Sequence, residues 1–165
     1  MGERLLTNSE AKTSPATKLA LAVRLGENLH AIPIAAVEEV LPALPIETVP
    51  QCPDFVRGVV FVRGHLIPVL DAAERLGIKD HQRPPEPPIV CLRIGDRLVG
   101  VEFDEALDLL ELHEVDSLTA EDVGAQSGFF AGVLEQDGQV IRLLDPEKMM
   151  AAEEADELQQ VPREA

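Results

Sequence analysis

Residues 58–71 read GVVFVRGHLIPVLD, and this stretch decides the fold. It consists of two runs rich in Val, Leu and Ile that meet at Arg63-Gly64, a pattern typical of two β-strands joined by a tight turn. The next residues, 72–76, can form one turn of helix, and Gly77 can end it in the left-handed conformation that glycine adopts readily. The stretch therefore predicts a β-hairpin followed by a short helix.

The same pattern returns in the second half of the chain. GVLEQDGQVIRLLD, residues 132–145, aligns without gaps on residues 58–71, and both copies end in Leu-Asp. VRLGENL, residues 23–29, aligns in the same way on LRIGDRL, residues 92–98. Chance can make two hairpins similar, because turn glycines and alternating apolar residues arise independently. Two gap-free matches in the same order favour an internal duplication instead.

The remaining apolar runs predict further strands of the two units. In each unit one hairpin comes first and another closes the unit. Short strands are predicted at residues 19–25, 29–32, 89–94, 98–103, 129–134 and 140–144, with turns at 26–28, 95–97 and 136–138. Asp145-Pro146 predicts a short helix, with the aspartate as cap and the proline at the first helical position.

Three segments do not fit a strand pattern. Residues 34–41, IAAVEEVL, are apolar at the first, fourth and eighth positions, a spacing that predicts two turns of helix docked on the rest of the protein. The four prolines within 41–53 favour an irregular connection. Residues 79–88, KDHQRPPEPP, are polar and proline-rich, which is typical of a linker.

Each unit then holds four or five short strands. An open sheet of that size leaves unpaired edges and one bare face. Closing the sheet into a small barrel removes the edges, and packing two barrels together covers apolar surface. The sequence therefore predicts a mostly β protein with two small β-barrels side by side and a few short helices. We expect them within residues 18–150, between a flexible leader at 1–17 and an acidic tail at 151–165.

The composition limits the possible partners. Of the 165 residues 45% are hydrophobic, which indicates a globular protein, and the core must be aliphatic because there are five Phe and no Trp or Tyr. A formal charge of −16 repels nucleic-acid phosphates and anionic lipid head groups. No apolar run is long enough to span a bilayer, and the start lacks the apolar core of a signal peptide. We therefore expect a cytoplasmic protein that neither binds nucleic acid nor inserts into a membrane.

Catalytic, metal and cofactor sites find little support in the sequence. Cys52 and Cys91 are isolated in the sequence, and we expect both to be reduced thiols. The four histidines show no paired spacing with each other or with the cysteines, so we expect no metal site. The chain contains no nucleophile elbow, no phosphate-binding loop and no zinc-protease helix motif. Adjacent carboxylates are expected on the solvated faces of a chain this acidic. We therefore predict a protein that is not an enzyme and binds no cofactor.

The segment from residue 31 to residue 77 carries a more specific pattern. Its motifs are I-x-x-V-x-E-V at 34–40, P-x-F-V-R-G at 53–58, V-R-G at 62–64 and I-P-V-L-D at 67–71. Together they resemble the CheW-like family, the coupling proteins of bacterial chemotaxis. RLVGVEFDEALDLLEL and GVLEQDGQVIRLLD continue the resemblance, which covers about residues 18–150.

This resemblance implies a scaffold of two SH3-like, five-stranded β-barrels that links chemoreceptor tips to the histidine kinase CheA. The kinase has a related regulatory domain, family members join it barrel against barrel, and a receptor hairpin binds in a groove between the barrels. The resemblance also implies that the first strand joins the barrel built mostly from the later sequence. We therefore expect a non-catalytic chemotaxis adaptor, cytoplasmic and associated with receptor arrays at the inner membrane.

The resemblance further implies binding residues. Arg63 matches the arginine of a family L-R-G turn implicated in receptor and kinase coupling. Val37, Glu39 and Gly58 match other positions implicated in those contacts. The chain departs from the family in having Phe-Val before this arginine where Asn-Leu is usual, which makes the turn more apolar.

The residues themselves also draw attention to Arg63 and to the segment before it. The counterpart of Arg63 in the second unit is Asp137 of an Asp-Gly turn, so Arg63 should lie at a turn tip. A guanidinium there offers planar, multi-donor geometry to carboxylates, although position alone would also suit a solvated surface arginine. Ile34, Val37 and Val40 are candidates for an apolar groove that receives a receptor helix tip, although apolar residues at such spacing are usually core.

Two other functions stay open at this point. An adaptor of pilus-driven motility or of another chemosensory-like pathway would use the same surfaces. A small-molecule-binding β-barrel, or an enzyme that uses the groove between the barrels, would need a deep pocket with converging polar groups. Under the adaptor hypothesis, the first unit carries more of the interaction chemistry because it holds Arg63 and the apolar segment 34–41.

Overall fold

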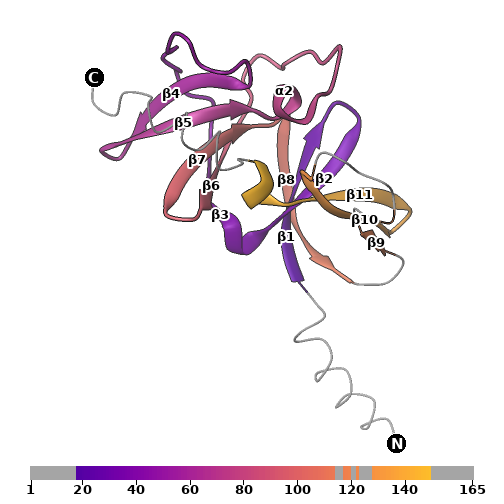
Figure 1. Ribbon diagram of the computed structural model, residues 1–165. Coiled ribbons are helices and arrows are strands. Elements are labelled where there is room, and N and C mark those ends of the chain that lie inside the picture. The colour runs from indigo at the N-terminus through magenta and orange to yellow at the C-terminus, as the bar shows by residue number, and fades with distance from the viewer. Residues whose placement is uncertain (1–17, 114–116, 120–121, 123–127, 150–165) are drawn as a thin grey trace, which may run out of the picture.

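The computed structural model describes residues 18–113, 117–119, 122 and 128–149, which form two β-sheets packed side by side (Figure 1). Sheet A has the strand order β8-β1-β2-β11-β10-β9, and sheet B has the order β3-β6-β7-β5-β4. Sheet A contains β1 (Lys18–Leu25), β2 (Asn28–Pro33), β8 (Glu105–Leu112), β9 (Ser117–Thr119), β10 (Phe130–Gln136) and β11 (Gln139–Leu144). Sheet B contains β3 (Val37–Leu41), β4 (Val56–Val62), β5 (His65–Asp71), β6 (Ile89–Ile94) and β7 (Arg97–Glu102). The helical turns are η1 (Ile34–Ala36), α2 (Ala72–Leu76) and η2 (Pro146–Met149).

This architecture confirms the predicted mostly β fold with two small subdomains. Sheet B has the five strands that were predicted for each subdomain, and sheet A adds a sixth, the short strand β9. The predicted leader and acidic tail lie outside the described residues. The range 18–150 for the folded domain stays a prediction.

The hairpin and the helix that decide the fold are confirmed. β4 and β5 pair antiparallel, and the turn between them places Arg63 and Gly64 at φ values of 50° and 82°. α2 begins after Asp71, whose carboxylate accepts a hydrogen bond from the backbone N–H of Ala73 at 3.0 Å. The helix ends at Gly77, where φ is 75°. The aspartate satisfies backbone donors that a helix start leaves free, and the glycine adopts the left-handed conformation at little cost.

The two sequence units exchange their first hairpins. β1 and β2 come from the first unit but lie in sheet A, between β8 and β11 of the second unit. β6 and β7 come from the second unit but lie in sheet B, between β3 and β5 of the first. The implied transfer of the first strand to the later barrel is therefore found, and it extends to the whole hairpin and occurs in both directions.

The two sheets share one plan, as a duplication requires. In each sheet the exchanged hairpin pairs in parallel with the last strand of the other unit, β2 with β11 and β7 with β5. In each sheet the closing hairpin has a register shift at its first strand, at Val56/Gly58 in sheet B and at Phe130/Gly132 in sheet A. These shared irregularities in strand pairing support the duplication more strongly than turn glycines do.

The glycines at these two bulges are required for the same structural reason. A Cβ on Gly58 would lie 2.1 Å from the backbone oxygen of Glu47, which pairs with Val59 in an isolated β-bridge. A Cβ on Gly132 would lie 2.5 Å from the backbone oxygen of Leu118 in β9. Each glycine therefore lets a neighbouring segment, the one that contains Glu47 or strand β9, approach the backbone of the closing hairpin.

The predicted helix at residues 34–41 is wrong. Only Ile34–Ala36 form a helical turn, and Val37–Leu41 form strand β3, which pairs antiparallel with β6. Two turns of helix would be marginal, whereas the β-branched Val37 and Val40 suit a strand that gains a ladder of backbone hydrogen bonds. Tertiary pairing decides the local structure here.

The linker and the crossings between sheets fall at different places. Residues 79–88 connect α2, which follows β5, to β6, and both of these strands belong to sheet B. The chain crosses between the sheets at η1 and again at residues 103–104. His81 and Arg83 in the linker contact Asp104 at 2.8 Å and Asp71 at 2.5 Å, respectively. The proline-rich segment is thus held against the protein by the hydrogen bond between His81 and Asp104 and by the ion pair between Arg83 and Asp71.

One apolar core lies between the sheets. It combines Leu21, Val23 and Ile32 of sheet A with Val90 and Leu92 of sheet B. Because side chains alternate along a strand, the opposite face of each sheet forms a smaller core of its own. The core of sheet A contains Ala20, Ala31, Leu112, Leu134 and Ile141, and that of sheet B contains Leu41, Val60, Ile67, Val69, Ile89 and Cys91.

The helical turns that end the two units meet through Arg75 of α2. Its guanidinium carbon lies 4.4 Å from the ring centroid of Phe55 and 4.6 Å from that of Phe129. Its Nε donates a hydrogen bond of 2.7 Å to the backbone oxygen of Met149 in η2. Cation–π contacts with two rings and a hydrogen bond tie the ends of the two sheets together.

His30 is buried where the first hairpin meets the second unit. It is opposite Arg142 in the parallel pairing of β2 with β11, and its ring stacks on Phe130 with centroids 6.0 Å apart. Burial, and secondarily the charge of Arg142, lowers the pKa of His30 from 6.5 to about 4. Its Nδ1 has no hydrogen-bond partner in the described part of the chain. The fold therefore requires the neutral imidazole.

We expect the free energy of unfolding to fall as the pH decreases from about 6.5 to about 4. In this window the unfolded chain takes up a proton on His30 that the folded chain does not, so acid favours unfolding, by up to about 3 kcal/mol. Urea titrations at several pH values would measure this. The His30→Leu variant should lose this part of the pH dependence of the free energy of unfolding, and the exposed-site control His65→Leu should keep it. An unchanged pH dependence in His30→Leu would contradict the assignment of the effect to His30.

Candidate protein-binding site

Arg63 lies at the tip of the β4–β5 turn, as the alignment with Asp137 predicts. Arg63 and Asp137 both have positive φ, 50° and 55°, and each is followed by a glycine in the same region. The Arg63 side chain is 68% exposed. It is therefore available to a partner.

Arg63 also connects two ends of sheet B. Its Nη1 donates to Oε2 of Glu39 on β3, the strand at the opposite end of the sheet from β4. The hydrogen bond to Glu39, followed by the charge of Glu39, raises the pKa of Arg63 above its usual value. The pair shows that sheet B curves round until its two ends approach each other. Its exposure to solvent means that it adds little stability of its own.

A second ion pair and a buried thiol lie next to this one. Arg93 on β6 donates to Glu38 on β3 at 3.0 Å, and both side chains are about half exposed. Cys91, the cross-strand partner of Glu39, is buried, and burial followed by the negative charge of Glu39 raises its pKa to about 11. The thiol is therefore protonated at neutral pH and is a poor nucleophile.

A second exposed feature is the open margin of the core between the sheets. On β3, Val37 and Val40 are the cross-strand partners of Leu92 and Val90, which belong to that core. Val37 packs against the core, and Val40 is 42% exposed. Ile34 of η1, which contacts both β1 and β6, also packs against it.

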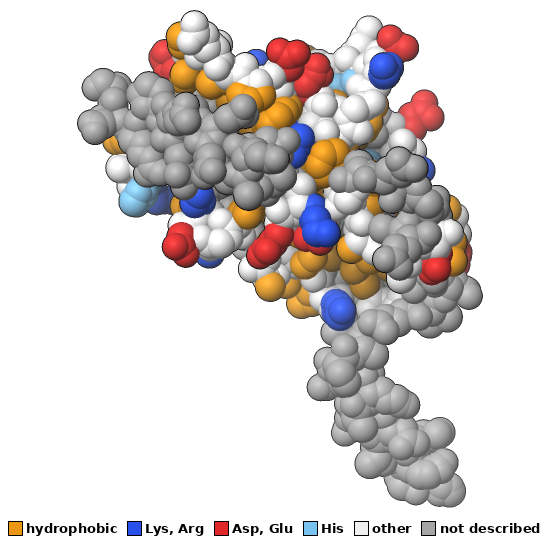
Figure 2. Space-filling model, viewed as in Figure 1, with side chains coloured by type: hydrophobic (Ala, Val, Ile, Leu, Met, Phe, Trp, Pro, Cys, Tyr) orange, Lys and Arg blue, Asp and Glu red, His pale blue; other side chains and the backbone are white. Residues whose placement is uncertain are grey.

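Sheet A contributes two further leucines to this margin. Leu109 on β8 is the partner of the core residue Leu21 on β1 and is 55% exposed. Leu19, two positions before Leu21 on the same face of β1, is 45% exposed. We call the set Leu19, Ile34, Val37, Val40 and Leu109 the inter-sheet margin. Figure 2 shows apolar side chains gathered in this region, beside the point where the chain enters β1.

The six residues predicted to bind partners divide into three groups. Arg63 and Glu39 contact each other, and Ile34, Val37 and Val40 lie together on the inter-sheet margin. Gly58 is buried beneath Glu47, where its lack of a side chain permits the β-bridge, and its role in partner binding stays a prediction.

Sequence reasoning missed three exposed apolar residues. Leu19 lies in a predicted strand, and Leu109 lies in a segment for which no strand is predicted; the exposure of both depends on which strand is the neighbour. Phe61 on β4 is 69% exposed, and the aligned position in the second unit is Glu135. A phenylalanine where the duplicate has a glutamate was a signal that the sequence did contain.

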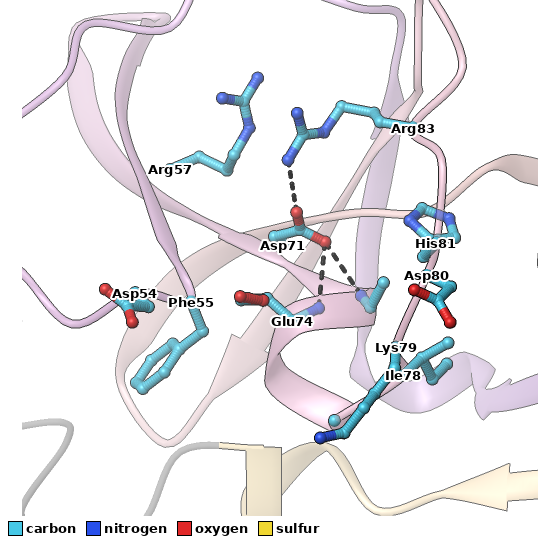
Figure 3. Close-up of a pocket in the computed structure, with 12 residues that line it drawn as sticks. Asp54, Phe55, Arg57, Asp71, Glu74, Ile78, Lys79, Asp80, His81 and Arg83 are labelled. Atoms are coloured by element: carbon cyan, nitrogen blue, oxygen red, sulfur yellow. Dashed lines mark hydrogen bonds and ion pairs between the residues drawn. The ribbon is translucent and has the colours of Figure 1, made fainter.

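A charged hollow of about 720 Å³ lies beside α2 and the linker (Figure 3). Arg83 donates to Asp71 at 2.5 Å, and Arg57 donates to Glu102 at 2.9 Å. Asp71 and Glu102 are partners on the parallel strands β5 and β7, and both carboxylates are largely buried. The arginines therefore compensate buried negative charges, and the packing of the fold accounts for the ion pairs in this hollow.

Neither a metal centre nor a membrane span emerges from the described residues. Within them, no group of three or more His, Cys, Asp or Glu side chains is placed to hold a metal ion. No helix among them is both long enough and apolar enough to cross a bilayer.

Comparison with known proteins gives a consistent picture. The family model described as the CheW-like domain matches residues 19–154. Chemotaxis protein CheW of Rhizobium meliloti is 27% identical over 151 residues, which cover 90% of this chain and 97% of that protein. Chemotaxis protein CheW of Thermotoga maritima is 32% identical over 132 residues, covering 79% and 85% of the two chains. The crystal structure of the scaffolding protein TtCheW from Thermoanaerobacter tengcongensis matches with a TM-score of 0.75 at 23% identity, covering 83% of this chain and 94% of that one.

Two arginine–glutamate pairs of sheet B should respond differently to truncation. Arg57→Ala leaves the buried Glu102 with less compensation and should lower the free energy of unfolding by about 2 kcal/mol. Arg63→Ala removes an exposed partner and should leave the unfolding midpoint nearly unchanged. Urea unfolding at neutral pH compares the two variants. An equal loss in both would show that the Arg63–Glu39 pair is structural.

Proposed function

We propose, on the premise that this chain belongs to the CheW-like domain family, that it couples a chemoreceptor tip to a CheA-type histidine kinase. Its role as a chemotaxis adaptor rests on curated relatives that are chemotaxis proteins CheW and on a shared fold of two SH3-like subdomains. The names of these relatives do not state the two partners of the proposal, the receptor tip and the kinase. The observation that supports them is the presence of two separate exposed features, one apolar and one charged, on a single compact scaffold.

The inter-sheet margin suits the receptor. A helical tip binds by laying an apolar stripe against an aliphatic surface, and it needs partly buried residues below and exposed residues at the rim. Ile34 and Val37 supply the partly buried floor, and Val40, Leu19 and Leu109 supply the exposed rim. The margin contains no aromatic side chain, so the contact is aliphatic.

The tip of the β4–β5 turn suits the kinase. Phe61 and Arg63 are both exposed and lie two residues apart, so an apolar anchor and a guanidinium are presented together. Nη1 of Arg63 is engaged by Glu39, and its Nε and Nη2 have no hydrogen-bond partner among the described residues. Arginine and aromatic side chains are enriched among residues that dominate binding at interfaces.

The remaining parts of the proposal follow from this role. The adaptor performs no catalysis, needs no cofactor, and acts in the cytoplasm beside receptor arrays at the inner membrane. The same surfaces would serve an adaptor of pilus-driven motility, and the identity of neighbouring genes would distinguish the two pathways. A small-molecule-binding barrel is not favoured, because the relatives are chemotaxis proteins CheW and the two arginines that line the hollow beside α2 are engaged by Glu102 and Asp71.

Receptor binding should depend on the inter-sheet margin. Val40→Asp places a charge within the apolar contact and should weaken binding to the receptor's cytoplasmic tip about tenfold or more. Val140→Asp is the matched control, since Val140 is 51% exposed on β11, outside the margin, and its affinity should stay within about twofold. Calorimetry measures both affinities. Equal losses in the two variants would argue against the margin as the receptor site.

Kinase binding should depend on the Arg63 turn. Arg63→Glu reverses the charge beside Glu39 and should weaken binding to the kinase regulatory domain, with the melting temperature nearly unchanged. Calorimetry and thermal unfolding give the two readouts. A large loss of stability would assign a structural role to the side chain. Failure of the unaltered protein to bind the kinase domain at about tens of micromolar would overturn the proposed function.

A further inference from the structure

The hairpin β1–β2 fills a slot that the rest of sheet A leaves in its middle. β1 pairs with β8 on one side, and β2 pairs with β11 on the other. All other strands of sheet A come from residues 105–144. Without the hairpin, sheet A would divide into β8 and the group β11-β10-β9, each with an unpaired edge.

The hairpin is joined to the rest of the folded protein by a short hinge. η1, Ile34–Ala36, follows Pro33 and contains no buried residue, and no side chain caps it. On either side the backbone is extended, with φ and ψ of −55° and 132° at Pro33 and −93° and 118° at Val37. Unwinding three residues would therefore convert the whole connection into an extended strand, at the cost of the contacts that η1 makes with β1 and β6.

We propose that the hairpin Lys18–Pro33 exchanges between two copies of this chain to give a strand-exchanged dimer. In that dimer each hairpin enters the sheet A slot of the partner copy, between its β8 and β11. All contacts of the hairpin with sheet A and with the core between the sheets are kept, now between chains, and the differences are confined to the hinge. Such exchange is an inexpensive route to a dimer because the interface already exists within the monomer.

The internal duplication is the strongest argument for this exchange. Within one chain, the hairpins β1–β2 and β6–β7 already occupy each other's units, with equivalent parallel pairings to β11 and β5. The slot therefore accepts a hairpin delivered by a different unit. A second copy of the chain presents the same hairpin with the same register. This inference rests on strand order and does not depend on the proposed function.

Hinge length should decide between monomer and dimer. A short connection that lets the hairpin fold back gives it an effective concentration of about millimolar. At micromolar chain concentration the closed monomer should therefore prevail. A hinge too short to turn back removes that advantage, and the exchanged dimer becomes the way to fill both slots.

The test changes the hinge and reports which chain supplies the hairpin. In one variant Ala35 and Ala36 are deleted. In the control variant a linker of four residues, alternating Gly and Ser, is inserted after Ala35. Both carry Leu19→Cys and Glu111→Cys, exposed partners across β1 and β8, in a Cys52→Ser background. Light scattering gives the mass, and non-reducing electrophoresis shows whether the disulfide lies within one chain or between two.

The deletion should give a dimer linked by interchain disulfides, and the insertion should give a monomer with an intrachain disulfide. A folded deletion variant that stays monomeric, or a dimer whose disulfides remain intrachain, would overturn the exchange. If the deletion variant does not fold, the same two cysteines are introduced into the protein with its natural hinge. This protein is then unfolded and refolded at rising chain concentration. The interchain fraction should then increase with concentration, and a fraction that stays at the level of the insertion control would overturn the proposal.

Discussion

The rest of the structure depends on a constraint that follows from the size of the units. A two-stranded hairpin and a few short strands cannot bury both faces or pair all edges alone. Here each unit places its first hairpin in the middle of the other unit's sheet, where both edges of the hairpin are paired. The two sheets are therefore not independent subdomains joined by a linker. The exchange also accounts for the core between the sheets. Leu21, Val23 and Ile32 reach this core from the hairpin of the first unit, and Val90, Leu92, Val99 and Val101 reach it from the hairpin of the second unit.

The sequence predicted most of the local structure and little of the exchange. The hairpins around Arg63-Gly64 and Asp137-Gly138 were predictable because turn chemistry is local. The helix expected over 34–41 was wrong because an apolar spacing of three and four residues fits a bulged strand as well, and pairing with β6 decided the matter. The position of the linker gave no information about the sheets, since strand partners depend on contacts far apart in the chain.

In the candidate site, too, local features were predictable from the sequence and those that depend on distant contacts were not. Arg63 was predictable because a turn tip exposes whatever residue occupies it. The motif match at Gly58 does not distinguish a contact residue from one that makes room for Glu47, so a binding role of Gly58 stays a prediction. Leu19 and Leu109 could not be identified, because their exposure depends on how the strands and sheets pack, which contacts far apart in the chain determine. The contrast between Phe61 and Glu135 was readable once the duplication had been found, since it shows which copy presents an apolar side chain.

β3 joins the two proposed binding surfaces within adjacent residues. After the register shift between Val37 and Glu39, Glu39 lies opposite Cys91, and Val40 lies opposite Val90, which belongs to the core between the sheets. Glu39 therefore meets Arg63 at one end of sheet B, while Val40 lies on the inter-sheet margin. A partner that moved β3 at either surface would move both side chains, because they share one short stretch of backbone at the edge of the sheet. Under the proposed function, a single edge strand thus relates the two bound partners, with no chain of interactions across the core.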